Sequence, residues 1–215
     1  MKLIQMFALI SACIFIISCT PNQTDKEEIK VSNDLYEIPE NCNFTTVQSG
    51  SQENECSPVL KDPFFSEFSG ILINGPKEII WPKNVSLEDH PPGPMGTTDG
   101  PLRLMIAGLV RIKFSTLGLK GDAGGEVLLV AVDQKTAQSY SGKMPKGDFE
   151  APPFFADPSN EPELTESEKN SLLSSHFNLD LVHDLELPIA DATYTIYATL
   201  GDYKSNELIV STKVK

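Results

Sequence analysis

Three histidines are the residues of this sequence that could most readily perform acid–base or metal chemistry. His176 and His183 are seven positions apart, which on a strand puts them on opposite faces, so a shared metal ion is not expected. His183 is in phase with Leu181 and Leu185, and this favours a core or sheet-rim histidine bonded to a backbone carbonyl over a functional site. His90 lies in a proline-rich loop and is expected to be solvated.

A cluster of acidic residues is a second candidate site. Its oxygen donors are suited to Ca²⁺, but the EF-hand spacing is absent and Pro158 and Pro162 restrict the loop, so a solvated acidic loop is favoured. The side chains concerned are Asp157, Asn160, Glu161, Glu163, Glu166 and Glu168.

Catalytic motifs are missing from the chain. It has no Gly-x-Ser-x-Gly turn, no phosphate loop ending in Gly-Lys-Ser/Thr, no Gly-x-Gly-x-x-Gly and no His-Glu-x-x-His. We therefore expect no enzyme, no cofactor and no metal site, although a carboxylate pair has no fixed spacing and is left open.

Two groups of aromatic residues could line a groove for a carbohydrate or a peptide, but packing against the core is the simpler interpretation. They are Phe64, Phe65, Phe68 and Trp81, and the pair Phe154–Phe155.

The N-terminus has the pattern of an export signal. Lys2 precedes an apolar run from Leu3 to Ile17, which is too short for a comfortable permanent membrane span. Ile16-Ile17-Ser18-Cys19 resembles the lipobox of bacterial lipoproteins, in which the cysteine is lipidated and becomes the new N-terminus. The resemblance implies palmitate-type acyl chains on Cys19, each buried methylene contributing about 0.8 kcal/mol to membrane anchoring. The alternative is an ordinary signal peptide with a chance cysteine.

The segment after Cys19 indicates which membrane would hold the lipoprotein and how the domain is connected to it. Thr20 stands where the inner-membrane retention signal of lipoproteins has Asp, so the resemblance implies the outer membrane, with the domain facing the periplasm or the cell surface. Residues 20–34 are polar and aperiodic, which predicts a flexible tether.

Removing residues 1–18 takes away Lys2 and no acid, which changes the net charge of the chain from −13 to −14 and argues against a nucleic-acid partner.

Cys42 and Cys56 are the cysteines left for the exported chain, because Cys13 leaves with the signal peptide and Cys19 carries the lipid. A disulfide between them closes a loop of about fifteen residues and contributes about 3 kcal/mol through chain entropy. The chain has no Cys-x-x-Cys pair for a redox role, and a zinc site would need further ligands nearby.

The globular part has the alternation of β-strands. Residues 102–114 alternate with period two and predict a half-buried strand, whereas residues 126–133 are apolar on both faces and predict a strand in the middle of a sheet. Residues 177–187 alternate up to Pro188, with Asn178, Asp180 and Asp184 on the polar face. Residues 193–200 and 208–214, joined by a polar loop, predict an antiparallel C-terminal hairpin. One short helix, from Glu166 to about Ser174, is indicated by a capping box.

Tyr194 stands at the entry to the penultimate strand, two positions before the core residue Ile196. This arrangement resembles the tyrosine corner of immunoglobulin and fibronectin-III sandwiches, although Ile196 replaces the core cysteine of antibody domains. The resemblance implies an all-β, antiparallel immunoglobulin-like sandwich and says nothing about the ligand. Another antiparallel β-fold with a terminal hairpin is the alternative.

These patterns predict four regions: a signal peptide (1–18), a tether (19–34), a disulfide-closed extension (35–65) and a β-sandwich (66–215). The expected function is a lipid-anchored envelope protein that binds or assembles a protein or glycan partner. A mainly structural envelope component is the alternative, and an enzyme without a visible motif is a third.

Overall fold

The computed structural model describes residues 35–62, 67–84, 102–113, 123–143 and 170–215, together with positions 115, 165 and 167. These residues belong to one compact unit, Val31–Lys215. The predicted signal peptide, the tether, His90 and the acidic cluster from Asp157 to Glu163, with Glu166 and Glu168, lie outside the described residues.

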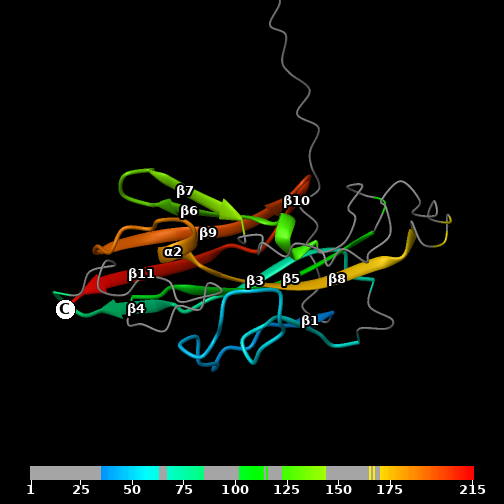
Figure 1. The fold of residues 1–215 in the computed structure, drawn as a ribbon, viewed down its shortest axis with the longest axis horizontal. Coiled ribbons are helices and arrows are strands. Elements are labelled where there is room, and N and C mark those ends of the chain that lie inside the picture. The colour runs from blue at the N-terminus through cyan, green and yellow to red at the C-terminus, as the bar shows by residue number, and fades with distance from the viewer. Residues whose placement is uncertain are drawn as a thin grey trace, which may run out of the picture. The chain divides into compact units, whose positions relative to one another are not determined.

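The described residues form two main sheets and a small strand pair (Figure 1). The large sheet contains, in spatial order, β4 (Glu78–Trp81), β11 (Leu208–Val214), β9 (Ala192–Leu200), β6 (Leu128–Asp133) and β7 (Ser139–Lys143), with β10 (Tyr203–Lys204) beside β9. The small sheet contains β3 (Gly70–Asn74), β5 (Met105–Lys113) and β8 (Leu172–Asp180). The remaining elements are the pair β1 (Tyr36–Glu37) and β2 (Val59–Leu60), the 3-10 turn η4 (Gly124–Glu126) and the helical turn α2 (Leu181–Asp184).

One hydrophobic core fills the space between the two sheets. Apolar side chains alternate toward it along each strand, because successive side chains of a strand point to opposite faces. Ile106, Val110 and Phe177 face it from the small sheet, and Leu129 and Ile196 face it from the large sheet. The fold is therefore mostly β, with sandwich-like sheets, as the sequence predicts.

The C-terminal hairpin is confirmed. β9 and β11 pair antiparallel, with Leu208 opposite Ile196 and Val210 opposite Tyr194. β6 lies between β9 and β7 and so has a partner on each side, as predicted. The expectation of a wholly antiparallel fold is wrong at one place, because β4 pairs parallel with β11. This pairing joins strands that are far apart in the sequence, so no local pattern signals it.

The expected half-buried strand at residues 102–114 is instead buried on both faces. β5 turns Ile106, Val110 and Ile112 into the core, but Met105 and Leu109 on its other face are at most 2% exposed. They are covered by the extension, residues 35–62, which Figure 1 draws in blue and cyan along β3, β5 and β8. The molecule thus has a third layer that alternation in the sequence cannot predict.

Two local predictions near β8 are wrong at their C-terminal ends. The predicted helix is helical at positions 167 and 170, which the structure describes, but Leu172 to Ser174 belong to the start of β8. The predicted strand 177–187 ends at Asp180, where the chain enters α2. Asp180 accepts a hydrogen bond from the backbone N–H of Val182, and such a cap favours a helical turn over a continuing strand.

Candidate functional site

The disulfide lies at the centre of the extension. Cys42 and Cys56 are bonded, with their Cα atoms 5.2 Å apart, which confirms the predicted pair. Cys56 is fully buried and packs with Val47 against Met105 and Ala107 of β5. The bridge therefore closes the covering layer on itself and packs against the small sheet. Cys19, the predicted lipidation site, lies outside the described residues.

Two asparagines of the small sheet bind the backbone of the extension. Asn74 Nδ2 donates to the carbonyl oxygens of Pro39 at 2.8 Å and Cys56 at 2.9 Å. Asn178 Nδ2 donates to the carbonyl oxygen of Gln52 at 2.7 Å, and Asn178 Oδ1 accepts from Asn54 Nδ2 at 2.8 Å. Buried amides of this kind replace the water that the covered carbonyls have lost.

Asn178 also pairs with the extension through its backbone. Its N–H donates to the Gly50 carbonyl at 2.8 Å, and its carbonyl accepts from the Gly50 N–H at 3.1 Å. The sequence pattern assigns Asn178 to a solvent-facing side of the strand, whereas the side chain is fully buried.

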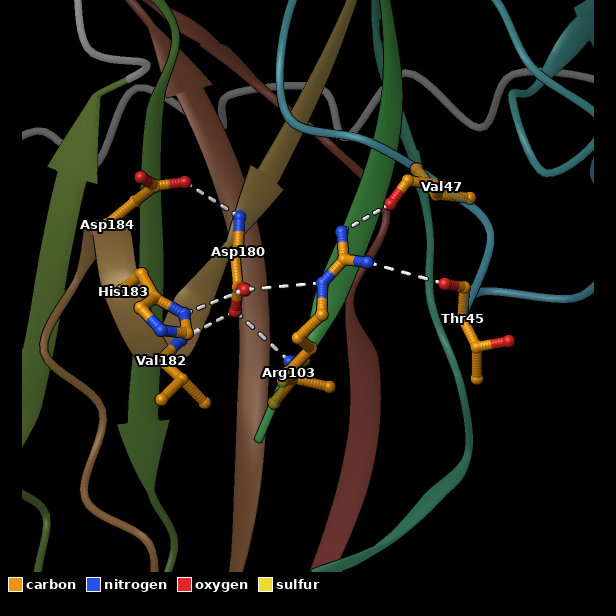
Figure 2. Close-up of polar contacts among 8 residues, drawn as sticks. Thr45, Val47, Arg103, Asp180, Val182, His183 and Asp184 are labelled. Carbon is orange, nitrogen blue, oxygen red and sulfur yellow. Dashed lines mark hydrogen bonds and ion pairs between the residues drawn. The ribbon is translucent and has the colours of Figure 1, made fainter. Parts of the chain in front are cut away.

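A group of charged side chains, here called the corner network, lies where β8 passes into α2. It consists of Arg103, Asp180, His183 and Asp184 (Figure 2). Asp180 is fully buried, and its Oδ1 accepts from the backbone N–H groups of Leu104 and Val182, each at 3.1 Å. Its Oδ2 lies 2.9 Å from His183 Nδ1 and 3.6 Å from Arg103 Nε. Charged hydrogen bonds offset the cost of burying this carboxylate.

Arg103 joins the corner network to the extension. Its Nη1 donates to the Thr45 carbonyl at 3.3 Å, and its Nη2 donates to the Val47 carbonyl. Figure 2 shows the guanidinium between Asp180 on one side and these two carbonyls on the other. One cation therefore connects the sandwich corner with the covering layer.

Asp184 is the member of the network whose acidity is clearly altered. Its Oδ2 accepts from the Asp180 N–H at 2.7 Å. The pKa of Asp184 is raised from 3.8 to about 6, chiefly by burial and also by the negative charge of Asp180, while the hydrogen bond from the Asp180 N–H and the charge of His183 act in the opposite direction. The carboxyl therefore changes its charge near pH 6.

The two histidines that the structure describes lie on different elements. His183 lies in α2, beside Asp180, a partner that a strand pattern does not predict. His176 lies on β8, and burial lowers its pKa.

Phe68 and Trp81 are buried, so the packing interpretation is confirmed for both. Phe64, Phe65, Phe154 and Phe155 lie outside the described residues.

The outer face of the large sheet is accessible to solvent. Ile80 on β4 is 52% exposed and Ile209 on β11 is 53% exposed, and Tyr197 on β9 is partly exposed. Lysines on this face are paired: Lys213 binds Glu78, and Lys204 binds Glu207 at 2.7 Å while lying over the Tyr197 ring. The two lysines and the two glutamates of these pairs therefore offset one another's charge on this face.

A hollow of about 580 Å³ opens at one end of this face. It lies where β6 ends, β9 begins and β11 ends, and its lining carries both charges and hydroxyl groups. The lining residues are Asp133, Gln134, Lys135, Asp191, Ala192, Thr193, Ser211, Thr212 and Lys213.

Comparison with known proteins finds no matching family, and no curated protein matches the sequence. Among the described residues, no group of His, Cys, Asp and Glu side chains is arranged to hold a metal ion. No helix in the described part of the chain is long and apolar enough to cross a membrane.

Proposed function

We propose that the protein is an envelope lipoprotein, acylated on Cys19, whose immunoglobulin-like domain binds a protein or glycan partner. The observation that carries the proposal is the contrast between the two outer faces. The extension buries the outer face of the small sheet, whereas the outer face of the large sheet presents Ile80, Ile209 and Tyr197 to solvent. Apolar side chains that lie together on an exposed sheet face, with polar residues around them, are typical of interaction surfaces.

The strand order supports the immunoglobulin-like assignment. In such sandwiches the last strand, the penultimate strand and a middle strand form one sheet, and two early strands join a later one in the other. The order β11–β9–β6–β7 opposite β3–β5–β8 has this arrangement, with the buried Tyr194 near the start of β9. The hydrogen bond from the Tyr194 hydroxyl that a tyrosine corner implies stays a prediction.

The lipid anchor is tested by radiolabelled palmitate. We expect label in the wild-type protein and none in Cys19→Ala, which should be released from the membrane fraction. Label or unchanged membrane retention in the variant would contradict the anchor.

The binding face is tested by photo-crosslinking in intact cells. A photoreactive amino acid replaces Thr195, on the outer face of the large sheet, or Thr45, an exposed residue of the extension as the matched control. We expect a reproducible adduct from position 195 alone, and peptide and glycan analysis of the adduct separates the two partner classes. Adducts from position 45 only, or none from either position, would favour a structural component.

A further inference from the structure

The hollow on the large sheet, at the end where Figure 1 marks the C-terminus, has hydroxyl groups on its floor. Thr193 on β9 and Ser211 on β11 are cross-strand partners on the outer face. The Ser211 N–H donates to the Lys77 carbonyl beside β4, so the backbone groups of this pair do not bond to each other. Side chains of such pairs lie close together, with Cα atoms about 4.5 Å apart. The floor therefore presents two adjacent hydroxyl groups.

Two carboxylates at the hollow are held in place by backbone N–H groups. Asp133, at the end of β6, accepts through Oδ1 from the N–H of Lys135 at 2.7 Å and of Thr136 at 3.3 Å. Asp191, just before β9, accepts through Oδ1 from the Val214 N–H at 2.7 Å. A carboxylate has about four acceptor positions, so each keeps capacity for a ligand. Acceptors that are already positioned lower the cost of binding.

Hydrogen-bond donors complete the lining. The Gln134 N–H donates to the Thr193 carbonyl at 2.9 Å, and Gln134 Nε2 donates to Thr195 Oγ1 at 3.0 Å. Two ammonium groups, of Lys135 and Lys213, line the same hollow. Lys213 is also paired with a glutamate of β4. Charges of both signs are therefore present and offset one another, which favours an uncharged ligand.

We propose that this hollow is a saccharide-binding subsite that takes a short, uncharged segment of a glycan. The inference rests on the proposed function and narrows its partner class from a protein or glycan to a glycan. Every sugar hydroxyl both donates and accepts, so one ligand can match the hydroxyls of the floor, the carboxylates and the donors. The volume of about 580 Å³ lies within the range of about 300–1,000 Å³ that is usual for ligand sites.

Exposed isoleucines beside the hollow suit the apolar side of a sugar. Ile80 is the cross-strand partner of Lys213, and Ile209 lies two residues before Ser211 on the same face of β11. A pyranose ring has C–H faces as well as polar edges. A glycan that leaves the hollow can therefore pack a ring face on these side chains and remove their apolar surface from water.

A peptide partner fits the hollow less well. Protein interfaces take most of their binding energy from aromatic or arginine anchors in desolvated pockets. Among the described residues that line the hollow, none is aromatic and Ala192 is the one with an apolar side chain. An apolar anchor would bury charged groups without partners, which is costly. A cationic anchor would meet Lys135 and Lys213 as well as the carboxylates.

Saturation-transfer NMR tests the subsite on the full chain, in a detergent without a sugar headgroup. The probes are maltotriose and tri-N-acetylchitotriose, which are uncharged, and trigalacturonate, which is acidic. We expect saturation transfer to an uncharged probe and weaker transfer to trigalacturonate. Transfer to neither uncharged probe, or stronger transfer to trigalacturonate, would overturn the inference.

Thr193→Val is the decisive variant, because valine has nearly the shape of threonine but no hydroxyl. We expect the dissociation constant of the bound probe to rise about tenfold. Thr199→Val, farther along the same face of β9 and also partly exposed, is the matched control and should bind as the wild type. Unchanged binding by Thr193→Val, or equal losses in the two variants, would refute the subsite.

Asp133→Asn keeps the test independent of that variant. The Asn oxygen can still accept from the backbone of the turn, while the charge and part of the acceptor capacity are lost. We expect binding about tenfold weaker with an unchanged circular dichroism spectrum. Asp202→Asn, in the exposed turn between β9 and β10, is its control and should have no effect. Wild-type binding by Asp133→Asn would remove the carboxylate from the site and overturn the arrangement proposed for it.

Photo-crosslinking at position 195 separates failure of the subsite from failure of the binding face, because Thr195 borders the hollow through Gln134. A peptide adduct without saturation transfer to the sugars would keep the binding face and refute the saccharide subsite. A glycan adduct whose yield falls in Thr193→Val would support both proposals. Neither an adduct nor saturation transfer would refute both.

Discussion

Asn74 and Asn178 flank Ala107 in one cross-strand row of the small sheet, and both bind backbone carbonyls of the extension. The small Ala107 side chain leaves room for the Cys56 side of the disulfide loop between the two amides. The two asparagines, on either side of the apolar contact between Ala107 and Cys56, fix the position of the extension along the sheet as well as its distance from the sheet. Hydrophobic burial alone would not select one position.

The first prediction concerns this row. Asn178→Ala removes the donor to the Gln52 carbonyl and the acceptor of the Asn54 amide, and it leaves these part-buried polar groups without that partner. We expect the free energy of unfolding to fall by about 1–3 kcal/mol. Urea denaturation measures the change, and Ser139→Ala, an exposed substitution on β7, should stay within about 0.5 kcal/mol of the wild type. Equal effects of the two substitutions would contradict a stabilising role for the hydrogen bonds of Asn178 to the extension.

The second prediction concerns the disulfide. Mass mapping of the exported protein without reduction should join the peptides that carry Cys42 and Cys56. Replacing both cysteines by serine should lower the free energy of unfolding by roughly 3 kcal/mol, since the bridge limits the unfolded chain. Free thiols at both positions in exported material would show that the bridge does not form in the cell.

The third prediction is a pH dependence of overall stability. The pKa of Asp184 is about 6 in the fold against an ordinary 3.8, so the folded state binds this proton more tightly than the unfolded state does. The resulting stabilisation is present below pH 4 and is lost as the pH rises through 6. Asp184→Asn should therefore be more stable than the wild type at pH 7.5, by about 1–2 kcal/mol after allowance for partial solvation.

Thermal denaturation at several pH values checks this prediction. The advantage of Asp184→Asn should shrink steadily below pH 6 and vanish below about pH 3, where the wild-type carboxyl is protonated in both states. A variant that is less stable than the wild type at pH 7.5 would show that the ionised carboxylate is needed at the corner.

Local patterns predict β6, β9 and β11 of the large sheet, but they fail to predict which faces of the small sheet are buried. The hairpin from Ala192 to Val214 joins neighbouring strands, so its alternation and turn residues specify it. Asn178 and Asp180 alternate with apolar residues in the same manner, yet both are fully buried. Alternation identifies the two faces of a strand, but it cannot say what covers the second face.

The sequence nevertheless carries a signal of the covering layer. The face of β5 assigned to solvent includes Met105, Ala107 and Leu109 as well as Arg111, and Leu109 packs with Leu60 and Phe68. Three apolar residues on a nominally polar face indicate a second contact. The corner network lacks such a signal, because it forms only when β5, β8 and α2 meet and Asp180 ends its strand.

The fourth prediction concerns Gly108, which lies opposite Phe177 across the β5–β8 pair. A Cβ atom added at Gly108 would lie 2.0 Å from Phe177 Cζ, so the ring occupies the space of a side chain. Gly108→Ala should destabilise the fold by about 1–3 kcal/mol through overpacking. Phe177→Leu should recover part of this loss in the double variant, and purely additive effects would argue against the direct contact.

The last prediction concerns Tyr194 and the final strand. β11 lies between β4 and β9, so deleting Leu208 to Lys215 strips partners from two strands and exposes several buried side chains. Such a loss, at about 1.5–3 kcal/mol for each side chain, consumes most of the roughly 5–15 kcal/mol that stabilises a domain. The truncated chain should therefore be unfolded by circular dichroism.

Tyr194→Phe is the finer probe of the same region. Tyr194 is 1% exposed and its ring meets that of Tyr140 edge-on, with the centroids 6.3 Å apart. The substitution keeps this contact and removes only the hydroxyl, so we expect a folded protein that is less stable by about 0.5–1.5 kcal/mol. A truncated chain that melts cooperatively at the wild-type temperature would show that β11 is an appendage, and the immunoglobulin-like assignment would then be withdrawn.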